Sequence, residues 1–292
     1  MPNETVAPWT VLRLLNWTKD YLAKANLDSP RLSAEMLLSH VLRCRRIELY
    51  ARFNYEPSEA ELSAYRELVK RAGVYEPVAY LVGTKEFYSL PFKVTADVLV
   101  PRSETEILVS EAVTALRKLG RPGRLWDVCT GSGCVAIAAA VQVADLQVLA
   151  SDISAAAVEI ARENAAANKV DSRVRCRVAD LLSLPEDCRD LAPFDVITGN
   201  PPYVADNQMI SETVKHEPSI AVHGGKDGLD FIRPFVRDAA AMLAPGGSLI
   251  MEFGFGQADD VRDLIVQGGL LAEPKILCDH QGIERATVAV RK

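Results

Sequence analysis

Hydrophobic and polar residues follow three different patterns along the 292-residue chain. Between residues 10 and about 73, apolar residues recur at steps of three and four, the spacing that gives a helix one apolar face. Ser29 before Pro30 is typical of a helix start, and Ser58 with Glu61 has the spacing of a capping box. This stretch therefore predicts a small helical unit, in which no residues are arranged like a catalytic site.

The second pattern begins at Gly83, where "KEFYSLPFKVTADVLVPR" alternates apolar and polar residues. Such alternation predicts a β-hairpin or an extended connector that ends near Pro101. Helical spacing returns in "SETEILVSEAVTALRKL", where Ser103 is the expected N-cap and Glu106 stands three residues later. We expect a helical domain, a β-hairpin connector and a larger domain, over residues 1–82, 83–101 and 102–292 respectively.

The third pattern, from residue 124 onward, alternates apolar strands with helices. The expected strands are "RLWDV", "QVLAS", "RVRCRVA", "FDVIT" and "SLIMEF", followed by two near residues 274–278 and 285–290. The expected helices are "CVAIAAAVQV", "AAAVEIARENAAAN", "DFIRPFVRDAAAML" and "QADDVRDLIVQG", and Gly246 with Gly247 should form the turn into "SLIMEF". This order predicts an α/β fold with a doubly wound, Rossmann-like, seven-stranded and mostly parallel sheet. Because the last two strands are joined closely, one of them should be antiparallel.

Composition and charge narrow the possible functions. The formal net charge is −6, so the chain lacks the basic balance that binding to nucleic-acid phosphates usually needs, and we expect no direct nucleic-acid binding. The six cysteines form no C-x-x-C pair and no cluster with the four histidines, which favours a reducing compartment and no metal site. With no signal peptide, and no apolar run long enough to cross a bilayer, we expect a cytoplasmic protein that does not bind membranes.

A glycine loop follows the first strand of the larger domain, in "DVCTGSGCVA". Gly131 and Gly133 allow a tight turn and a close approach of backbone to ligand, and the next helix directs its N–H groups at that turn. Asp152 ends the second strand, 21 residues after Gly131, where a carboxylate can accept hydrogen bonds from two ribose hydroxyls. Because Gly131, Gly133 and Ala136 also fit G-x-G-x-x-A, a nicotinamide or flavin enzyme suits the loop nearly as well.

Asp127, four residues before Gly131, favours one cofactor over the others. A carboxylate at that place repels the pyrophosphate of a dinucleotide but attracts the ammonium group of S-adenosyl-L-methionine. No lysine follows the glycines, which argues against a P-loop for nucleoside triphosphates. The loop therefore predicts binding of S-adenosyl-L-methionine.

The strand "FDVIT" ends in "GNPPYV", a combination that suits a methyl-accepting nitrogen. The lone pair of an amide or aromatic amine is delocalised, so fixed acceptors for its hydrogens help more than a base does. Asn200 offers a side-chain carbonyl, Pro201 a backbone carbonyl, Pro202 stiffens the segment, and the Tyr203 ring can lie against a planar group. In an arbitrary protein the same letters describe only a rigid turn, but their position after the fourth strand favours a site.

Taken together, these residues resemble the HemK/PrmC family over nearly the whole chain. The segments that carry the resemblance are "EPVAYLVGTKEFYSLPFKV", "VLVPRSETEILV", "DVCTGSGCVAIA", "SDIS", "FDVITGNPPYV", "HEPSIAVHGGKDGLDF" and "APGGSLIMEFGFGQ". The resemblance implies a class I S-adenosylmethionine-dependent methyltransferase fold. It also implies that the chain methylates the glutamine of the Gly-Gly-Gln motif in class 1 peptide chain release factors, with the helical domain and connector docking the release factor.

The resemblance also assigns site residues. It implies cofactor contacts at Cys129, Thr130, Gly131, Ser132, Gly133, Asp152, Asp180, Leu181 and Asn200, and substrate contacts at Asn200, Pro201, Pro202 and Tyr203. Cys129 stands where many members have glycine, which is tolerable if the position needs no positive φ. Leu181 replaces an aromatic residue that stacks on adenine in some members. "PRSETE" has serine where proline is commoner, and a sister family that modifies a ribosomal protein also carries "PRS".

Other polar residues have two interpretations each. Glu104 and Glu106 either line the mouth of the site or simply favour a helix start, and Glu217 either shapes the substrate pocket or is structural. His216 and His223 are expected to be structural or exposed, because the chemistry needs no strong base.

Several functions stay open at this point. Glutamine methylation of a ribosomal protein is one, and methylation of an adenine amino group on nucleic acid is another, although the acidic balance argues against it. A nicotinamide oxidoreductase and a non-catalytic cofactor-binding protein also fit the fold, but neither needs an intact "NPPY".

Overall fold

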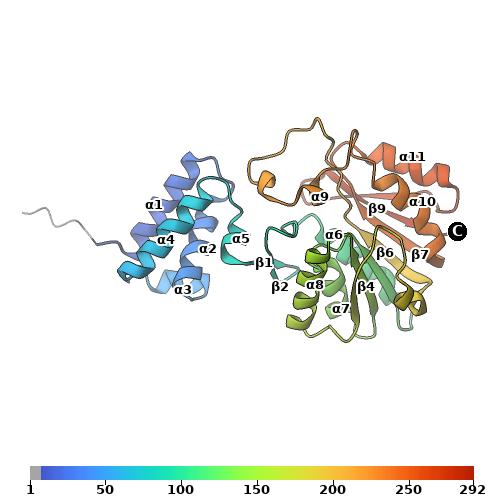
Figure 1. The fold of residues 1–292 in the computed structure, drawn as a ribbon, viewed down its shortest axis with the longest axis horizontal. Coiled ribbons are helices and arrows are strands. Elements are labelled where there is room, and N and C mark those ends of the chain that lie inside the picture. Colours follow the sequence, from blue (N-terminus) through green and yellow to red (C-terminus); the bar gives the residue numbers. More distant parts are fainter. Residues whose placement is uncertain (1–7) are drawn as a thin grey trace, which may run out of the picture. The chain divides into compact units, whose positions relative to one another are not determined.

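The computed structural model describes residues 8–292, and their contacts divide the chain into two units (Figure 1). One unit comprises the described residues up to Gly83 together with Ser211–His216, and the other comprises Thr84–Ile210 with Glu217–Lys292. The helical unit therefore includes a short segment from the second half of the chain, which the expected domain limits assigned to the larger domain.

The helical unit is built from the amphipathic stripes expected for it. Its helices are α1 (Val11–Lys24), α2 (Pro30–Val41), α3 (Arg46–Ala51), α4 (Glu59–Ala72) and α5 (Val78–Val82), with the 3₁₀ turn η2 (Val214–His216). The capping box of α4 is confirmed, since the Ser58 N–H donates to Glu61 Oε2 at 2.7 Å. Ser29 precedes α2 as expected, but its hydroxyl makes no capping hydrogen bond, because its backbone is left-handed with φ 51°.

The connector is a β-hairpin, as the alternating pattern predicts. β1 (Thr84–Phe87) pairs antiparallel with β2 (Leu90–Lys93), and both turn residues, Tyr88 and Ser89, have positive φ, as in a type I′ turn. The Phe87 ring packs edge-on against Phe92, with 6.0 Å between ring centroids, and both rings are buried.

The larger unit contains the expected seven-stranded sheet, in the order β5-β4-β3-β6-β7-β9-β8. Its strands are β3 (Arg124–Val128), β4 (Gln147–Asp152), β5 (Val174–Val178), β6 (Phe194–Gly199), β7 (Leu243–Glu252), β8 (Lys275–Cys278) and β9 (Glu284–Val290). The pairs from β5 through β7 are parallel and β9 is antiparallel to both its neighbours, so one antiparallel strand is confirmed.

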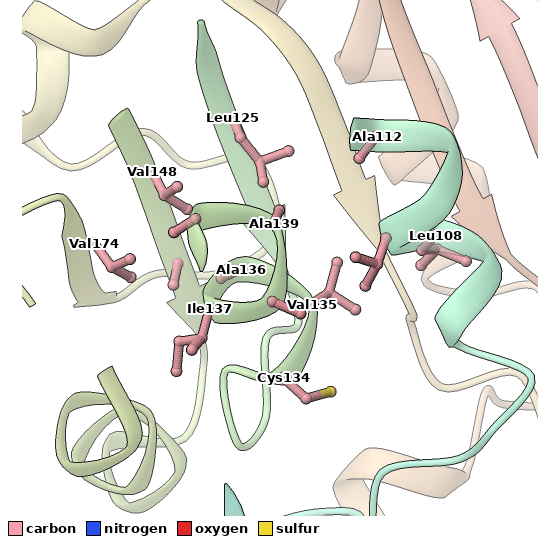
Figure 2. Close-up of a cluster of buried hydrophobic side chains, with 14 of the residues drawn as sticks. Leu108, Ala112, Leu125, Cys134, Val135, Ala136, Ile137, Ala139, Val148 and Val174 are labelled. Carbon is pink, nitrogen blue, oxygen red and sulfur yellow. The ribbon is translucent and has the colours of Figure 1, made fainter. Parts of the chain in front are cut away.

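Helices cover both faces of this sheet (Figure 1). They are α6 (Glu106–Arg117), α7 (Cys134–Gln142), α8 (Ala155–Ala167), α9 (Ser219–Val222), α10 (Ile232–Met242) and α11 (Ala258–Gly268), with the 3₁₀ segment η1 (Glu186–Leu191). Alternate strand residues enter two separate cores. Leu125 and Val148 pack with α6, α7 and α8 (Figure 2). Trp126, whose side chain points to the opposite face of the sheet, packs in the core that contains α10 and α11. The central strands β3, β4 and β6 are therefore buried on both sides, which is why they read as apolar runs.

Two local predictions were wrong. The helix α6 begins at Glu106 rather than near Ser103, whose hydroxyl instead contacts Glu104; the residue before α6 is Thr105, and its side chain makes no cap either. Gly246 and Gly247 do not precede a strand but lie within β7, at the irregularity where the β6–β7 register shifts.

Asn164 of α8 joins the hairpin to the loop that precedes α7. Its Oδ1 accepts the Lys93 N–H at 2.7 Å, and its Nδ2 donates to the carbonyls of Lys93 at 3.0 Å and Ser132 at 2.9 Å. The side chain is 1% exposed, so solvent cannot replace these hydrogen bonds.

We predict that Asn164→Ala lowers the free energy of unfolding by about 2–4 kcal/mol, since three backbone groups lose a buried partner. Asn168→Ala is the matched control, because Asn168 contacts the same hairpin through Pro91, at a partly exposed position. It should cost about 1 kcal/mol or less. Urea denaturation of the two variants measures both values, and equal losses would contradict this account.

Candidate functional site

The carboxyl ends of the parallel strands border a cavity of about 260 Å³. This is the edge at which ligands bind in doubly wound sheets, and the strand order reverses there between β3 and β6. Ten of the residues expected to form the site line the cavity: Asp127, Cys129, Thr130, Gly131, Ser132, Asp152, Asp180, Leu181, Asn200 and Pro202. Three do not line it: Gly133, Pro201 and Tyr203.

The glycine loop between β3 and α7 has the conformation that its glycines predict. Gly133 precedes α7 with φ 81°, and a Cβ there would lie 2.8 Å from Ile137 Cδ1 and 3.1 Å from Ala161 Cβ. Gly131 has φ 54° and open space where its Cβ would stand. Gly133 is therefore required by packing and turn geometry, whereas Gly131 leaves room on the cavity side.

The condition under which Cys129 would be tolerated without strain, a position that needs no positive φ, is not met. Its backbone φ is 56°, in the left-handed region, because the chain must turn sharply as it leaves β3. A non-glycine residue there costs about 1–2 kcal/mol. Burial raises the pKa of the Cys129 thiol, and Asp152 and Asp127 nearby reinforce the rise, so the side chain is a neutral thiol. Leu181, the other unusual residue, also has positive φ, at 42°.

Asp152 holds the glycine loop against the end of β4. Its Oδ2 accepts the Gly131 N–H at 2.9 Å and its Oδ1 accepts the Ser154 N–H at 3.0 Å. Burial raises the pKa of this carboxyl, and these backbone donors oppose the rise. Each oxygen keeps one further lone pair, so the carboxylate can accept two more hydrogen bonds from a ligand.

Asp127 is almost fully buried, with 2% of its surface exposed. The Thr130 hydroxyl donates to its Oδ2 at 2.5 Å and the Thr198 hydroxyl to its Oδ1 at 2.7 Å. Burial raises the pKa of Asp127 to about 6, even though both hydroxyls oppose the rise. The carboxylate is therefore ionised at neutral pH, and keeping this charge buried lowers the stability of the fold.

The segment after β6 is held rigidly. A Cβ on Gly199 would lie 2.4 Å from the Phe235 ring, so β6 and α10 approach closely just before Asn200. The Tyr203 hydroxyl donates to Glu252 Oε1 at 3.1 Å, and the Tyr203 carbonyl accepts from Gln257 Nε2 at 3.1 Å. Tyr203 is thus fixed at its ring and at its backbone.

Sequence reasoning missed two side chains that are linked to this segment by hydrogen bonds, Thr105, which also lines the cavity, and Glu252. Asn200 Nδ2 donates to Thr105 Oγ1 at 3.3 Å, and Thr105 Oγ1 donates to Glu252 Oε2 at 2.6 Å. Thr105 lies in "PRSETE", which the family resemblance includes, and Glu252 ends β7, the strand next to β6. An acid at the carboxyl end of a neighbouring strand was the available signal, and the rule applied to Asp127 and Asp152 also selects Glu252.

The remaining polar candidates lie outside the cavity lining. Glu217 has a fully buried side chain and pairs with Arg102 at 2.5 Å, and only Arg102 of the two lines the cavity. Glu106 accepts the Tyr88 N–H at 2.8 Å and so supports the hairpin turn. His216 is exposed and belongs to the helical unit, and His223 is half-buried.

Two further searches cover residues 8–292. No group of three or more His, Cys, Asp or Glu side chains there is arranged to hold a metal ion. None of the helices described is both long and apolar enough to span a bilayer.

Two family models match the chain. The one described as "PrmC N-terminal domain" matches residues 13–83, and the one described as "Methyltransferase small domain" matches residues 103–226. The second match includes both the glycine loop and the segment from Asn200 to Tyr203.

Individual proteins are similar over greater lengths. A release factor glutamine methyltransferase of Rhodopirellula baltica is 42% identical over 284 residues, covering 95% of this chain and 95% of that protein. One of the same name from Geobacter sulfurreducens is 39% identical over 280 residues, also with 95% of each covered. Among solved structures, a methyltransferase from Pyrococcus furiosus covers 79% of this chain and 98% of its own, with a TM-score of 0.50 and 19% identity, which indicates a shared fold.

We predict that Asp127→Asn changes the pH dependence of stability in a defined direction. In the wild type the folded pKa of Asp127, about 6, lies above its unfolded value. The contribution of Asp127 to the free energy of unfolding is therefore greatest below pH 4 and is lost as the pH rises through 6. The variant lacks this loss of stability, so between pH 4 and pH 7 its free energy of unfolding should rise by roughly 2 kcal/mol relative to that of the wild type. Urea unfolding of both proteins at several pH values measures the difference between their free energies of unfolding. The contributions of the other carboxylates are the same in both proteins and cancel in this difference. A difference that stays constant with pH would exclude a raised pKa at Asp127.

Proposed function

This chain belongs to the family of release factor glutamine methyltransferases, and from that premise we propose a specific reaction for it. It transfers a methyl group from S-adenosyl-L-methionine to the side-chain amide nitrogen of the glutamine in the Gly-Gly-Gln motif of class 1 release factors. The observation that carries the proposal is the identity of 42% over nearly the full length of a relative with that name.

The chemistry of the cavity lining supports S-adenosyl-L-methionine. Four carboxylates lie on its wall, those of Asp97, Asp127, Asp152 and Asp180, and Arg102, the basic side chain among the lining residues described, is paired with Glu217. Such a lining suits a cationic ligand without phosphates. When bound, this cofactor supplies a methyl group activated by a positively charged sulfur.

Each part of the cavity lining has a proposed role. Asp152 accepts hydrogen bonds from the ribose hydroxyls through its two remaining lone pairs. Asp127 attracts the ammonium group, and the loop from Cys129 to Gly133 presents its backbone to the ligand. Asp180 and Leu181, which follow β5, border the adenine.

Asn200 and Pro201 hold the substrate nitrogen. Its two hydrogens are donated to the side-chain carbonyl of Asn200 and to the backbone carbonyl of Pro201. Both acceptors stabilise the positive charge that develops on nitrogen as the new bond forms, so no strong base is needed. Pro202 limits the motion of this segment, and the Tyr203 ring bounds the planar carboxamide.

The helical unit supplies the proposed recognition of the protein substrate. Its match to a PrmC N-terminal domain supports a role in docking the release factor, together with the hairpin connector. The partner would be a class 1 release factor and the place of action the cytoplasm. The net charge of −6 gives no support to a nucleic-acid substrate.

The decisive experiment is mass spectrometry of Gly-Gly-Gln peptides. Purified release factors, a ribosomal protein fraction and DNA are each incubated with this protein and S-adenosyl-L-methionine. The expected result is a gain of one methyl group on the release-factor glutamine, and none on a control in which that glutamine is replaced by alanine. Methylation confined to the ribosomal proteins or to DNA would overturn the proposal.

We predict that Asn200→Ala separates binding from transfer. The cofactor Kd should stay within a few-fold, because other lining residues provide most contacts, while kcat falls by roughly 10²-fold or more through loss of a charge-stabilising acceptor. Asp152→Ala is the matched variant on the cofactor side and should weaken cofactor binding first. Calorimetry and single-turnover transfer distinguish them, and an Asn200→Ala protein with the wild-type kcat would refute the proposed clamp.

A further inference from the structure

A line of hydrogen bonds runs from Asn200 through Thr105, both of which line the cavity, to Glu252, which does not. It passes from Asn200 Nδ2 to Thr105 Oγ1 at 3.3 Å and from Thr105 Oγ1 to Glu252 Oε2 at 2.6 Å. Thr105 is 3% exposed and Glu252 is 2% exposed, so water does not compete for these contacts. Three segments of the larger unit, far apart in sequence, therefore meet at one hydroxyl group.

The direction of each hydrogen bond in this line follows from the carboxylate at its end. Thr105 Oγ1 donates to Glu252 Oε2, so the single hydroxyl hydrogen of Thr105 is used in that hydrogen bond. Thr105 Oγ1 is then left with lone pairs alone toward Asn200, and only the NH₂ end of the carboxamide can satisfy them. The carbonyl end, Asn200 Oδ1, is consequently the end left for a ligand.

We propose that Thr105 and Glu252 are positioning residues that fix which end of the Asn200 carboxamide faces the substrate nitrogen. The inference rests on the proposed function, in which Asn200 must present an acceptor. A carboxamide turned by half a revolution would present two N–H donors to a substrate N–H, and the two would repel. Neither Thr105 nor Glu252 needs to touch the substrate.

The other oxygen of Glu252 strengthens the assignment. The Tyr203 hydroxyl donates to Oε1 at 3.1 Å, so the same carboxylate anchors the first and last residues of the segment Asn200–Tyr203. Burial raises the pKa of Glu252 and Glu104 adds to the rise, while the two hydroxyl donors and the charge of Arg285 oppose it. A buried carboxylate destabilises a fold through the loss of its hydration, and a neutral side chain would fill a purely structural position equally well.

The first test compares Thr105→Val with Thr105→Ser. Valine keeps the shape of threonine but removes the hydroxyl, and kcat should fall roughly 10- to 100-fold, as for loss of a hydrogen bond tied to a charged group. Serine keeps the hydroxyl and should stay within about threefold of the wild type. The cofactor Kd should be unchanged in both, which separates lost positioning from a damaged cavity.

The second test repeats Thr105→Val in an Asn200→Ala background, with transfer followed under single-turnover conditions. If Thr105 acts through the carboxamide, removing its hydroxyl should lower the rate by less than about twofold once the carboxamide is gone. A 10-fold or larger additional loss would overturn the inference, because Thr105 would then act by an independent route. Tyr203→Phe, made alone, removes the hydrogen bond to Glu252 Oε1 and measures how much of the transfer rate depends on that contact.

A spectroscopic test does not depend on activity. In ¹⁵N-labelled protein, the side-chain NH₂ signals of Asn200 are identified by their absence from Asn200→Ala, and they should shift in Thr105→Val and in Glu252→Gln but not in Thr105→Ser. Unshifted signals in folded Thr105→Val protein, or wild-type kcat, would refute the inference. Failure of the proposed function has a different signature, namely shifted signals in the variants but no methylation of Gly-Gly-Gln peptides by the wild type.

Discussion

The site depends on placing four polar side chains, two of them buried and two partly buried, at one edge of the sheet with a hydrogen-bond partner for each. Asp152, Asp127, Asn200 and Glu252 lie at or just after the ends of β4, β3, β6 and β7, which are adjacent in that order. Unpaired polar groups at such depth cost several kcal/mol each. Each of the four is instead bonded to a neighbouring loop or strand, so the interactions that allow burial also fix the positions of the functional groups.

Much of this arrangement could be predicted from the sequence, because it depends on local patterns. The alternation of apolar strands and helices is set by periodicity, and helix and strand limits agree with expectation within two residues across the sheet, apart from the early start of β7. Asp152 could be placed because a carboxylate that ends the strand after a glycine loop has few other positions open to it. Asn200 could be placed for a similar reason, because it directly follows β6, the strand on the other side of β3 from β4.

The rest depends on contacts between residues far apart in the chain. Nothing local to "PRSETE" indicates that Thr105 donates its hydroxyl hydrogen to Glu252 instead of capping its own helix, because Glu252 lies 147 residues further along the chain. The left-handed turn at Cys129 is likewise imposed by the exit from β3 and not by the preference of cysteine. Ser103 failed as a cap for a related reason: the chain still turns there, and α6 starts three residues later.

The side chain of Asn164 gives the hairpin and the glycine loop a shared support. One amide group holds the backbone of Lys93 with one end and both Lys93 and Ser132 with the other. A change to the connector therefore also affects the wall of the cavity, which Ser132 lines. A connector taken from a relative keeps its position only if the protein that receives it has the same amide side chain on α8.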